Sequence, residues 1–244
     1  SKTQHLWEKA KQKSDFALIR PDLEKLYELA HEMAVKLDED QHPYDNLLDM
    51  YEPNMTQTMV SQYFGTLKTG VKGVLENILA HPDRTTNDIL MIRATDAQQA
   101  QLSALLMEFV GLTPDRSRLD TVEHPFTIGA YDDVRITTHY IENDPMGSFY
   151  AVMHEAGHAR YELDLPPEHR YTAIGTAAGL GIHESQSRFI ENMLGRDPAF
   201  LRFIFPKIQE IIPGFQALNL TQFTEAVNYV APSKIRIYAD EVTY

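Results

Sequence analysis

The sequence contains no cysteine among its 244 residues. Disulfide bonds and thiolate metal ligands are therefore excluded, and a transition metal would have to be bound by histidine and carboxylate side chains. A chain without cysteine suits a reducing compartment. No apolar run has the length of a transmembrane span, and the first residues, SKTQHLWEKAKQK, lack the apolar segment of a secretory signal. We therefore expect a cytoplasmic protein.

Positive charge is also scarce. Lysine and arginine total 22 against 35 aspartates and glutamates, which gives a formal net charge of -13. A surface with this balance repels the phosphate backbone of nucleic acids and the anionic face of a membrane. The composition therefore predicts neither a nucleic-acid partner nor a membrane partner.

Residues 1–112 have the apolar spacing of consecutive helices. Apolar residues recur with a period near 3.6 over residues 20–37, where Pro21 occupies a tolerated position in the first turn. Similar stripes follow Pro53 and run over residues 96–110. No linker or internal repeat divides the chain, so we expect one domain over its whole length.

The pattern changes at residues 121–142, where two short runs of β-branched and aromatic residues flank residues 129–133. In the second run alternate residues share one face, namely Val134, Ile136, Thr138 and Tyr140. This alternation predicts a β-hairpin or a small sheet edge. Helices are expected again over residues 145–244, so the fold class is mainly α with one small β element.

The motif HEAGH, residues 154–158, lies within a helix that Asp144 and Pro145 are expected to begin. His154 and His158 are four residues apart, so they lie on one helical face and can bind one ion. Glu155 is displaced around the helix and can reach a metal-bound water as a general base. With 10 histidines in 244 residues, a chance match is expected in roughly a few per cent of such chains.

A catalytic zinc site needs a third protein ligand. Glu162 lies on the same face as His158, but one rigid helix would place three ligands in a line. Asp164 lies at the end of that helix, with no better-defined geometry. Glu184, in GIHESQSRFIEN, begins a second amphipathic segment and could complete a tetrahedral site from a facing helix. The alternative for Glu184 is an acid at a helix start that pairs with Arg188.

Five motifs in order resemble the M32 family of metallocarboxypeptidases, the carboxypeptidase Taq type. They are HPF at 124–126, DVRIT at 133–137, HEAGH at 154–158, HESQ at 183–186 and IRIYAD at 235–240. The likeness extends to HPYDNLLDMYEPNMT at 42–56, so it covers essentially the whole chain. It implies a large helical, gluzincin-like metallopeptidase domain with His154, His158 and Glu184 as metal ligands and Glu155 as the catalytic base.

The resemblance also implies the removal of C-terminal amino acids from peptides with a free C-terminus. Zinc is the first expectation for the metal, with cobalt or manganese as alternatives. Arg236 is a candidate to bind the substrate carboxylate, because a guanidinium matches a carboxylate bidentately. Arg135 could contact substrate at the sheet edge or simply pair with Asp133 at the surface. His124 is expected to support the site by hydrogen bonding rather than to bind the metal.

Members of the family are longer and carry a GxxQDxHW motif that is absent here, so the resemblance implies the middle segment of a full-length enzyme. We expect this segment to bind metal but to show little or no hydrolysis alone, and we expect the full-length enzyme to be a homodimer. Two alternatives stay open, namely an endo-acting HExxH oligopeptidase and a catalytically silent metal-binding helical fragment.

Overall fold

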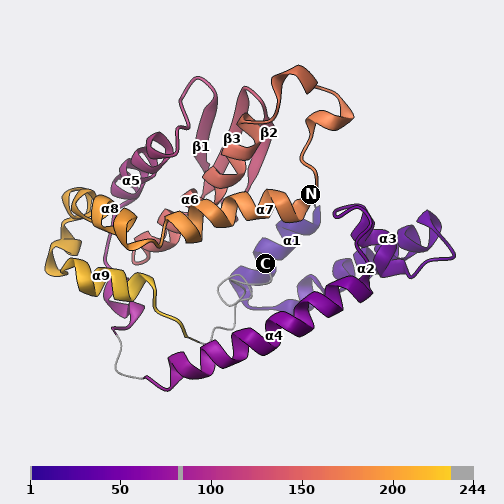
Figure 1. The fold of residues 1–244 in the computed structure, drawn as a ribbon, viewed down its shortest axis with the longest axis horizontal. Coiled ribbons are helices and arrows are strands. Elements are labelled where there is room, and N and C mark those ends of the chain that lie inside the picture. Colours follow the sequence, from indigo (N-terminus) through magenta and orange to yellow (C-terminus); the bar gives the residue numbers. More distant parts are fainter. Residues whose placement is uncertain (1, 82–84, 232–244) are drawn as a thin grey trace. The chain divides into compact units, whose positions relative to one another are not determined.

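The computed structural model describes residues 2–81 and 85–231 (Figure 1). Two compact units divide the chain, Ser1–Lys68 and Thr69–Tyr244. Both are dominated by helices, and the second contains a three-stranded sheet. The predicted fold class, mainly α with one small β element, is confirmed. The boundary between the units falls within one continuous helix, so a single domain over 1–244 stays a prediction.

The first unit consists of helices that follow one another along the chain. They are α1 (Lys2–Lys13), η1 (Phe16–Leu18), α2 (Arg20–Leu37), α3 (Pro43–Asp49) and the first part of α4 (Gln57–Leu79). The helix predicted over residues 20–37 is confirmed, with Pro21 in its first turn. The amide of Asn46 donates to the carbonyl oxygens of Ala34, at 2.8 Å, and Asp38, at 2.7 Å. These bonds connect α3 to the end of α2.

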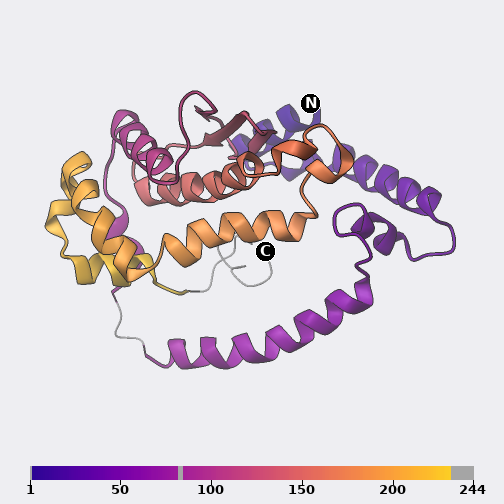
Figure 2. The ribbon, with the colours of Figure 1, turned by 45° about the horizontal axis from the view of Figure 1, so that its top comes forward.

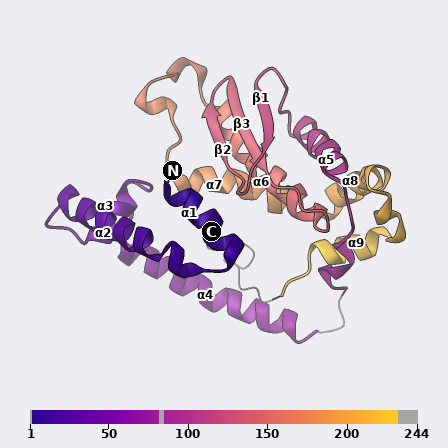
Figure 3. The ribbon, with the colours of Figure 1, turned by 180° about the vertical axis from the view of Figure 1, so that it is seen from behind.

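The sheet of the second unit contains β1 (Ser117–Thr121), β2 (Thr127–Ala130) and β3 (Asp133–Thr138) in the order β1-β3-β2. The antiparallel pair β2 and β3 is the predicted hairpin. Gly129, with φ +112°, adopts a backbone conformation that other residues rarely reach. Strand β1 was not predicted, and it pairs in parallel with β3 (Figures 1 and 3).

Helix α6 (Pro145–Leu163) is the centre of the second unit. It contacts β2 and β3 on one side and α5 (Asp96–Phe109) and α7 (Leu180–Arg188) on others. Figure 2 shows α6 between the sheet and α7. Its core positions follow the helical period and are fully buried, namely Phe149, Val152, Met153 and Ala156.

The remaining elements named for this unit are all helical. They are η2 (Asn87–Leu90), η3 (Pro167–His169), η4 (Ala173–Gly175), the π-helical turn η5 (Phe189–Leu194), α8 (Pro198–Ile211), η6 (Pro213–Ala217) and α9 (Leu220–Val227). Turn η5 continues α7 directly. Within 2–81 and 85–231, no helix combines the length and apolar character needed to cross a bilayer.

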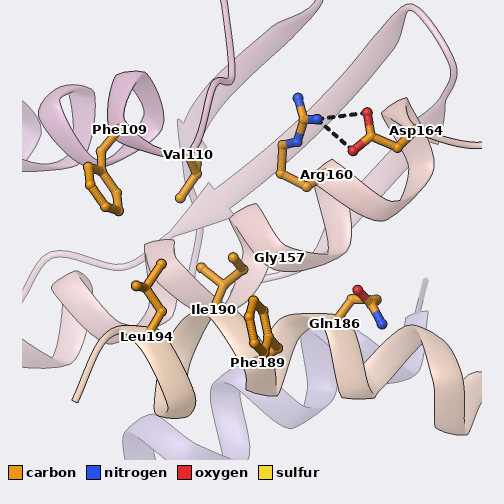
Figure 4. Close-up of a pocket in the computed structure, with 9 residues that line it drawn as sticks. All are labelled: Phe109, Val110, Gly157, Arg160, Asp164, Gln186, Phe189, Ile190 and Leu194. Carbon is orange, nitrogen blue, oxygen red and sulfur yellow. Dashed lines mark hydrogen bonds and ion pairs between the residues drawn. The ribbon is translucent and has the colours of Figure 1, made fainter. Parts of the chain in front are cut away.

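Helices α6 and α7 come into close contact at Gly157, the fourth residue of HEAGH. A Cβ atom added there would lie 2.5 Å from the Ser187 Cα and 2.6 Å from the Gln186 carbonyl oxygen. Both are backbone atoms, so they cannot rotate away as a side chain could. Figure 4 shows Gly157 facing α7 beside a small pocket. Only glycine permits this contact between the helices.

We expect Gly157→Ala to lower the free energy of unfolding by about 1–3 kcal/mol, the usual range for overpacking in a core. The matched control is Gly65→Ala on α4, where an added Cβ would meet no heavy atom within 4 Å. Alanine there should raise stability by about 0.5–1 kcal/mol because it favours the helix. Urea unfolding monitored by circular dichroism measures both changes. Equal effects of the two substitutions would contradict a tight contact at Gly157.

Candidate metal centre

Helix α6 presents HEAGH in the predicted orientation. The Asp144 side chain accepts a hydrogen bond from the Gly147 N–H at 3.0 Å, and Pro145 occupies the first turn, so the helix begins where the sequence predicted. His154 and His158 lie one turn apart on the same face, with ring centroids separated by 4.9 Å. Both side chains are largely buried, at 14% and 15% exposure.

Glu184 reaches these imidazoles from α7. Its Oε2 lies 3.1 Å from His158 Nε2, and its Oε1 lies 3.7 Å from His154 Nε2. One candidate ligand atom from each of the three residues lies within 4.8 Å of the others. Among the described residues, this is the one group of histidine and acidic side chains that could bind a metal ion in this way. The structure therefore brings together the three predicted ligands from two facing helices.

The chemistry of this triad fits a divalent metal. Two imidazole nitrogens and one carboxylate are a donor set that zinc, cobalt and manganese accept, and zinc in catalytic sites commonly has three such protein ligands. The Oε1 atom of Glu184 is buried and has no hydrogen-bond partner among the described residues. A buried carboxylate oxygen without a hydrogen bond is costly, and coordination to a cation would satisfy it.

The ring of His154 is oriented by Glu191 of η5. His154 Nδ1 lies 2.8 Å from Glu191 Oε2, which leaves Nε2 directed toward Glu184. Arg188 Nη1 donates to the same Glu191 oxygen at 2.9 Å. Metal-binding histidines usually have such a carboxylate partner on the second ring nitrogen. Glu191 was not predicted from the sequence, although its spacing of seven residues from Glu184 corresponds to two helical turns.

Burial and neighbouring charges have opposite effects on the pKa values of His154 and Glu184. Burial alone would lower the pKa of His154, but the hydrogen bond and charge of Glu191 outweigh it, helped by Glu184 and Glu155, so this pKa is raised. Burial alone would raise the pKa of Glu184. The hydrogen bond from His158 and the positive charges of both histidines and Arg188 lower it instead. Glu184 is therefore held in the ionised form that binds a cation.

Glu155 is not in the group of three candidate ligands, and its side chain contacts β2. The side chain is buried, and the Thr127 hydroxyl at the start of β2 lies 2.5 Å from Glu155 Oε2. The same hydroxyl lies 3.1 Å from the carbonyl oxygen of Glu155. Strand β2 therefore holds the candidate base in place. Thr127 directly follows HPF in the sequence, but no local pattern predicted its contact with α6.

The alternative ligands occupy other contacts. Glu162 Oε1 lies 2.8 Å from His183 Nε2, and Asp164 forms an ion pair with Arg160 at 2.5 Å. Figure 4 shows the latter pair at the wall of the pocket beside Gly157, a pocket that none of the three predicted ligands lines. Neither acid joins His154 and His158.

Two other predicted site residues, Arg135 and His124, lie at the surface. Arg135 pairs with Asp133 through two hydrogen bonds, at 3.0 and 3.1 Å, and both side chains are exposed. This is the surface pairing that the sequence left open as an alternative. His124 is exposed, and no hydrogen bond within the described part of the chain connects it to the triad. Arg236 lies outside the described residues.

Comparison with known proteins places the chain among metallopeptidases. The family model for carboxypeptidase Taq (M32) metallopeptidase matches residues 1–244. Carboxypeptidase 1 of Bacillus subtilis is 37% identical over 246 residues, which cover 100% of this chain and 49% of that protein. Thermostable carboxypeptidase 1 of Thermus thermophilus is 39% identical over 254 residues, which cover 100% and 50% respectively. The chain thus spans about half the length of these relatives.

Solved structures share the fold. The crystal structure of BsuCP matches with a TM-score of 0.93 at 37% identity and covers 100% of this chain and 49% of that one. The structure of Pyrococcus furiosus carboxypeptidase, described as Apo-Mg, matches with a TM-score of 0.87 at 34% identity and covers 98% and 48%. The likeness therefore extends over nearly the whole chain.

We expect Glu184→Gln to weaken zinc binding by at least about 100-fold, more than is typical when only a partner of a ligand is lost. The amide keeps the size of the side chain but removes the charge and one acceptor oxygen. Asp164→Asn is the control, because Asp164 was an alternative ligand and is exposed beside Arg160. Competition with a chromophoric chelator measures both affinities. Stronger loss in Asp164→Asn than in Glu184→Gln would overturn the ligand assignment.

Proposed function

The chain belongs to the carboxypeptidase Taq (M32) metallopeptidase family, and we propose that it forms the metal centre of a carboxypeptidase that removes C-terminal amino acids from peptides. The observation that carries this proposal is the convergence of His154, His158 and Glu184 from two helices beside the buried Glu155. A free C-terminus is the proposed substrate feature. A homodimer and a cytoplasmic location stay predictions from the sequence.

Zinc is the metal we propose for the three ligands, and cobalt or manganese would also suit two imidazoles and a carboxylate. When bound, zinc would supply a water with a pKa of about 7 and a Lewis acid for the scissile carbonyl. The chain's own residues supply the ligands and the proton acceptor.

Glu155 is the proposed general base. Its carboxylate accepts a proton from the attacking water and then delivers that proton to the leaving amine. The Thr127 hydroxyl at 2.5 Å holds one carboxylate oxygen, so the other can face the reacting atoms. Burial of Glu155 supports this role, because a proton acceptor in a site shielded from bulk water interacts more strongly with developing charge.

The substrate is proposed to bind along β2 as an extended strand. In the described sheet β2 is an edge strand, and it lies against α6. An edge strand offers backbone groups that a peptide can pair with. Arg236 is proposed to bind the terminal carboxylate through its guanidinium, and Arg135 is proposed as a second contact that would have to leave Asp133.

Two other functions make different predictions. An endo-acting oligopeptidase would cleave inside peptides and would not need a free C-terminus. A silent metal-binding fragment would bind zinc without hydrolysis. Peptides with a blocked C-terminus separate the first alternative from the proposed function. The second alternative has to be tested in a protein of the length that members of the family have.

The proposed function is tested in a chimera in which residues 1–244 replace the matching half of Bacillus subtilis carboxypeptidase 1, the relative that is 37% identical. We expect zinc-dependent release of the C-terminal amino acid from N-blocked peptides and no release from the same peptides with a C-terminal amide. Equal cleavage of the amides would favour the endopeptidase. A folded, zinc-loaded chimera without hydrolysis would favour the silent fragment.

In the same chimera we expect Glu155→Gln to retain zinc and to lower kcat by at least ~10²-fold, because general-base catalysis contributes about 10²–10⁴. Glu168→Gln, at an exposed glutamate of η3, is the control and should leave both quantities unchanged. Zinc content by atomic absorption and initial rates of amino-acid release provide the measurements. Unchanged turnover in Glu155→Gln would remove this residue from the mechanism.

A further inference from the structure

His183, the first residue of HESQ, lies between two residues of α6. Its Nδ1 is 2.6 Å from His158 Nδ1, and its Nε2 is 2.8 Å from Glu162 Oε1. The side chains of His183 and Glu162 are largely buried, at 16% and 18% exposure. The ring of Tyr161 packs edge-on against His183 at 5.0 Å. Helix α7 thus contributes two neighbouring residues, His183 and Glu184, to the surroundings of one metal-ligand candidate.

A metal on His158 Nε2 would need the lone pair of that nitrogen, so the ring proton of a neutral His158 would lie on Nδ1. The Glu162 carboxylate can only accept, so the proton of His183 lies on Nε2. His183 Nδ1 then carries a lone pair and must accept the proton of His158 Nδ1. His158 Nε2, which lies 3.1 Å from Glu184 Oε2, would then offer its lone pair to the ion that Glu184 also binds.

We infer that His183, backed by Glu162, is a positioning residue that fixes the tautomer and orientation of His158 so that Nε2 can bind the metal. The inference rests on the proposed metal centre and deepens it. Glu191 makes the corresponding bond to His154 directly. The two candidate ligand histidines are therefore oriented by different hydrogen-bond partners. His154 bonds to a carboxylate, and His158 bonds to an imidazole that in turn bonds to a carboxylate.

Purely steric packing of His183 makes a different prediction. A ring of similar size without nitrogen would preserve packing against Tyr161 but could not accept the proton of His158. Likewise, a glutamine at position 162 could still accept from His183 through its amide oxygen, whereas a leucine could not. These pairs of substitutions separate the hydrogen bonds from the volume of the side chains.

The first measurement is the zinc affinity of the 244-residue chain by chelator competition. We expect His183→Phe to weaken binding 10- to 100-fold, the usual effect of losing such a partner. Glu162→Leu should weaken zinc binding as well, and the zinc affinity of Glu162→Gln should stay nearer to that of the unmodified chain. The control His139→Phe removes a histidine that hydrogen-bonds the Val122 carbonyl oxygen instead of joining this network, and it should leave affinity unchanged. Circular dichroism checks that each variant folds.

The second measurement is the ring protonation of the zinc-loaded chain by long-range ¹H–¹⁵N NMR in mildly alkaline buffer. We expect His158 to carry its proton on Nδ1 and His183 on Nε2, with His183→Phe identifying the signals. Glu162→Leu should mix the tautomers of His183, and Glu162→Gln should not. A packing role alone would leave these signals unchanged.

The inference is overturned if His158 carries its proton mainly on Nε2, or if His183→Phe weakens zinc binding no more than His139→Phe. If the affinities and tautomers are as expected but the chimera does not hydrolyse peptides, only the proposed function is overturned. A chain that binds no zinc would contradict the proposed metal centre and, with it, this inference.

Discussion

The close contact of α6 with α7 at Gly157 is the constraint on which the site depends. Two histidines on one helix can lie on the same side of an ion, but a third ligand must come from elsewhere to complete a tetrahedral set. Because Gly157 lets the α7 backbone come within van der Waals distance, the Glu184 side chain, one turn earlier on α7, reaches both imidazoles. A side chain at residue 157 would separate the helices, and the carboxylate would lose this reach. The glycine inside HEAGH therefore matters as much for geometry as the histidines do for chemistry.

The contact between α6 and α7 also brings several ionisable side chains together in a poorly solvated region. Three carboxylates, those of Glu155, Glu184 and Glu191, surround the two histidines, and Arg188 provides one guanidinium against Glu184 and Glu191. Burying like charges together costs several kcal/mol per uncompensated ion. A divalent cation brings two positive charges to this place, so metal binding would offset the electrostatic cost of the packing. Binding of a metal to the proposed ligands would therefore be coupled to the stability of the contact between α6 and α7.

Local rules predicted the elements of this arrangement better than their partners. The apolar period of α2, the Asp144 cap of α6 and the alternation around Gly129 are encoded in neighbouring residues, and these elements formed where expected. Strand β1 was missed because SRLDT has no clear apolar alternation and because β2 separates it in the sequence from its parallel partner β3. Glu191, His183 and Thr127 were missed for a related reason. Their contacts depend on how two helices and a strand pack, which spacing along one element does not specify.

The hydroxyl of Thr127 connects the edge strand β2 with the candidate base Glu155, and its two possible acceptors allow the Glu155 carboxylate to rotate. A threonine hydroxyl has one proton, and here two acceptors of the same residue lie within reach, Oε2 of Glu155 at 2.5 Å and its carbonyl oxygen at 3.1 Å. If the carboxylate turns toward a reacting water, the hydroxyl can donate to the carbonyl instead. No buried hydrogen-bond donor is then left unsatisfied, so the rotation avoids the penalty of about 1–3 kcal/mol for such a group. Because Thr127 is part of β2, the strand proposed to bind the peptide and the residue proposed to accept its proton keep a fixed relation throughout this movement.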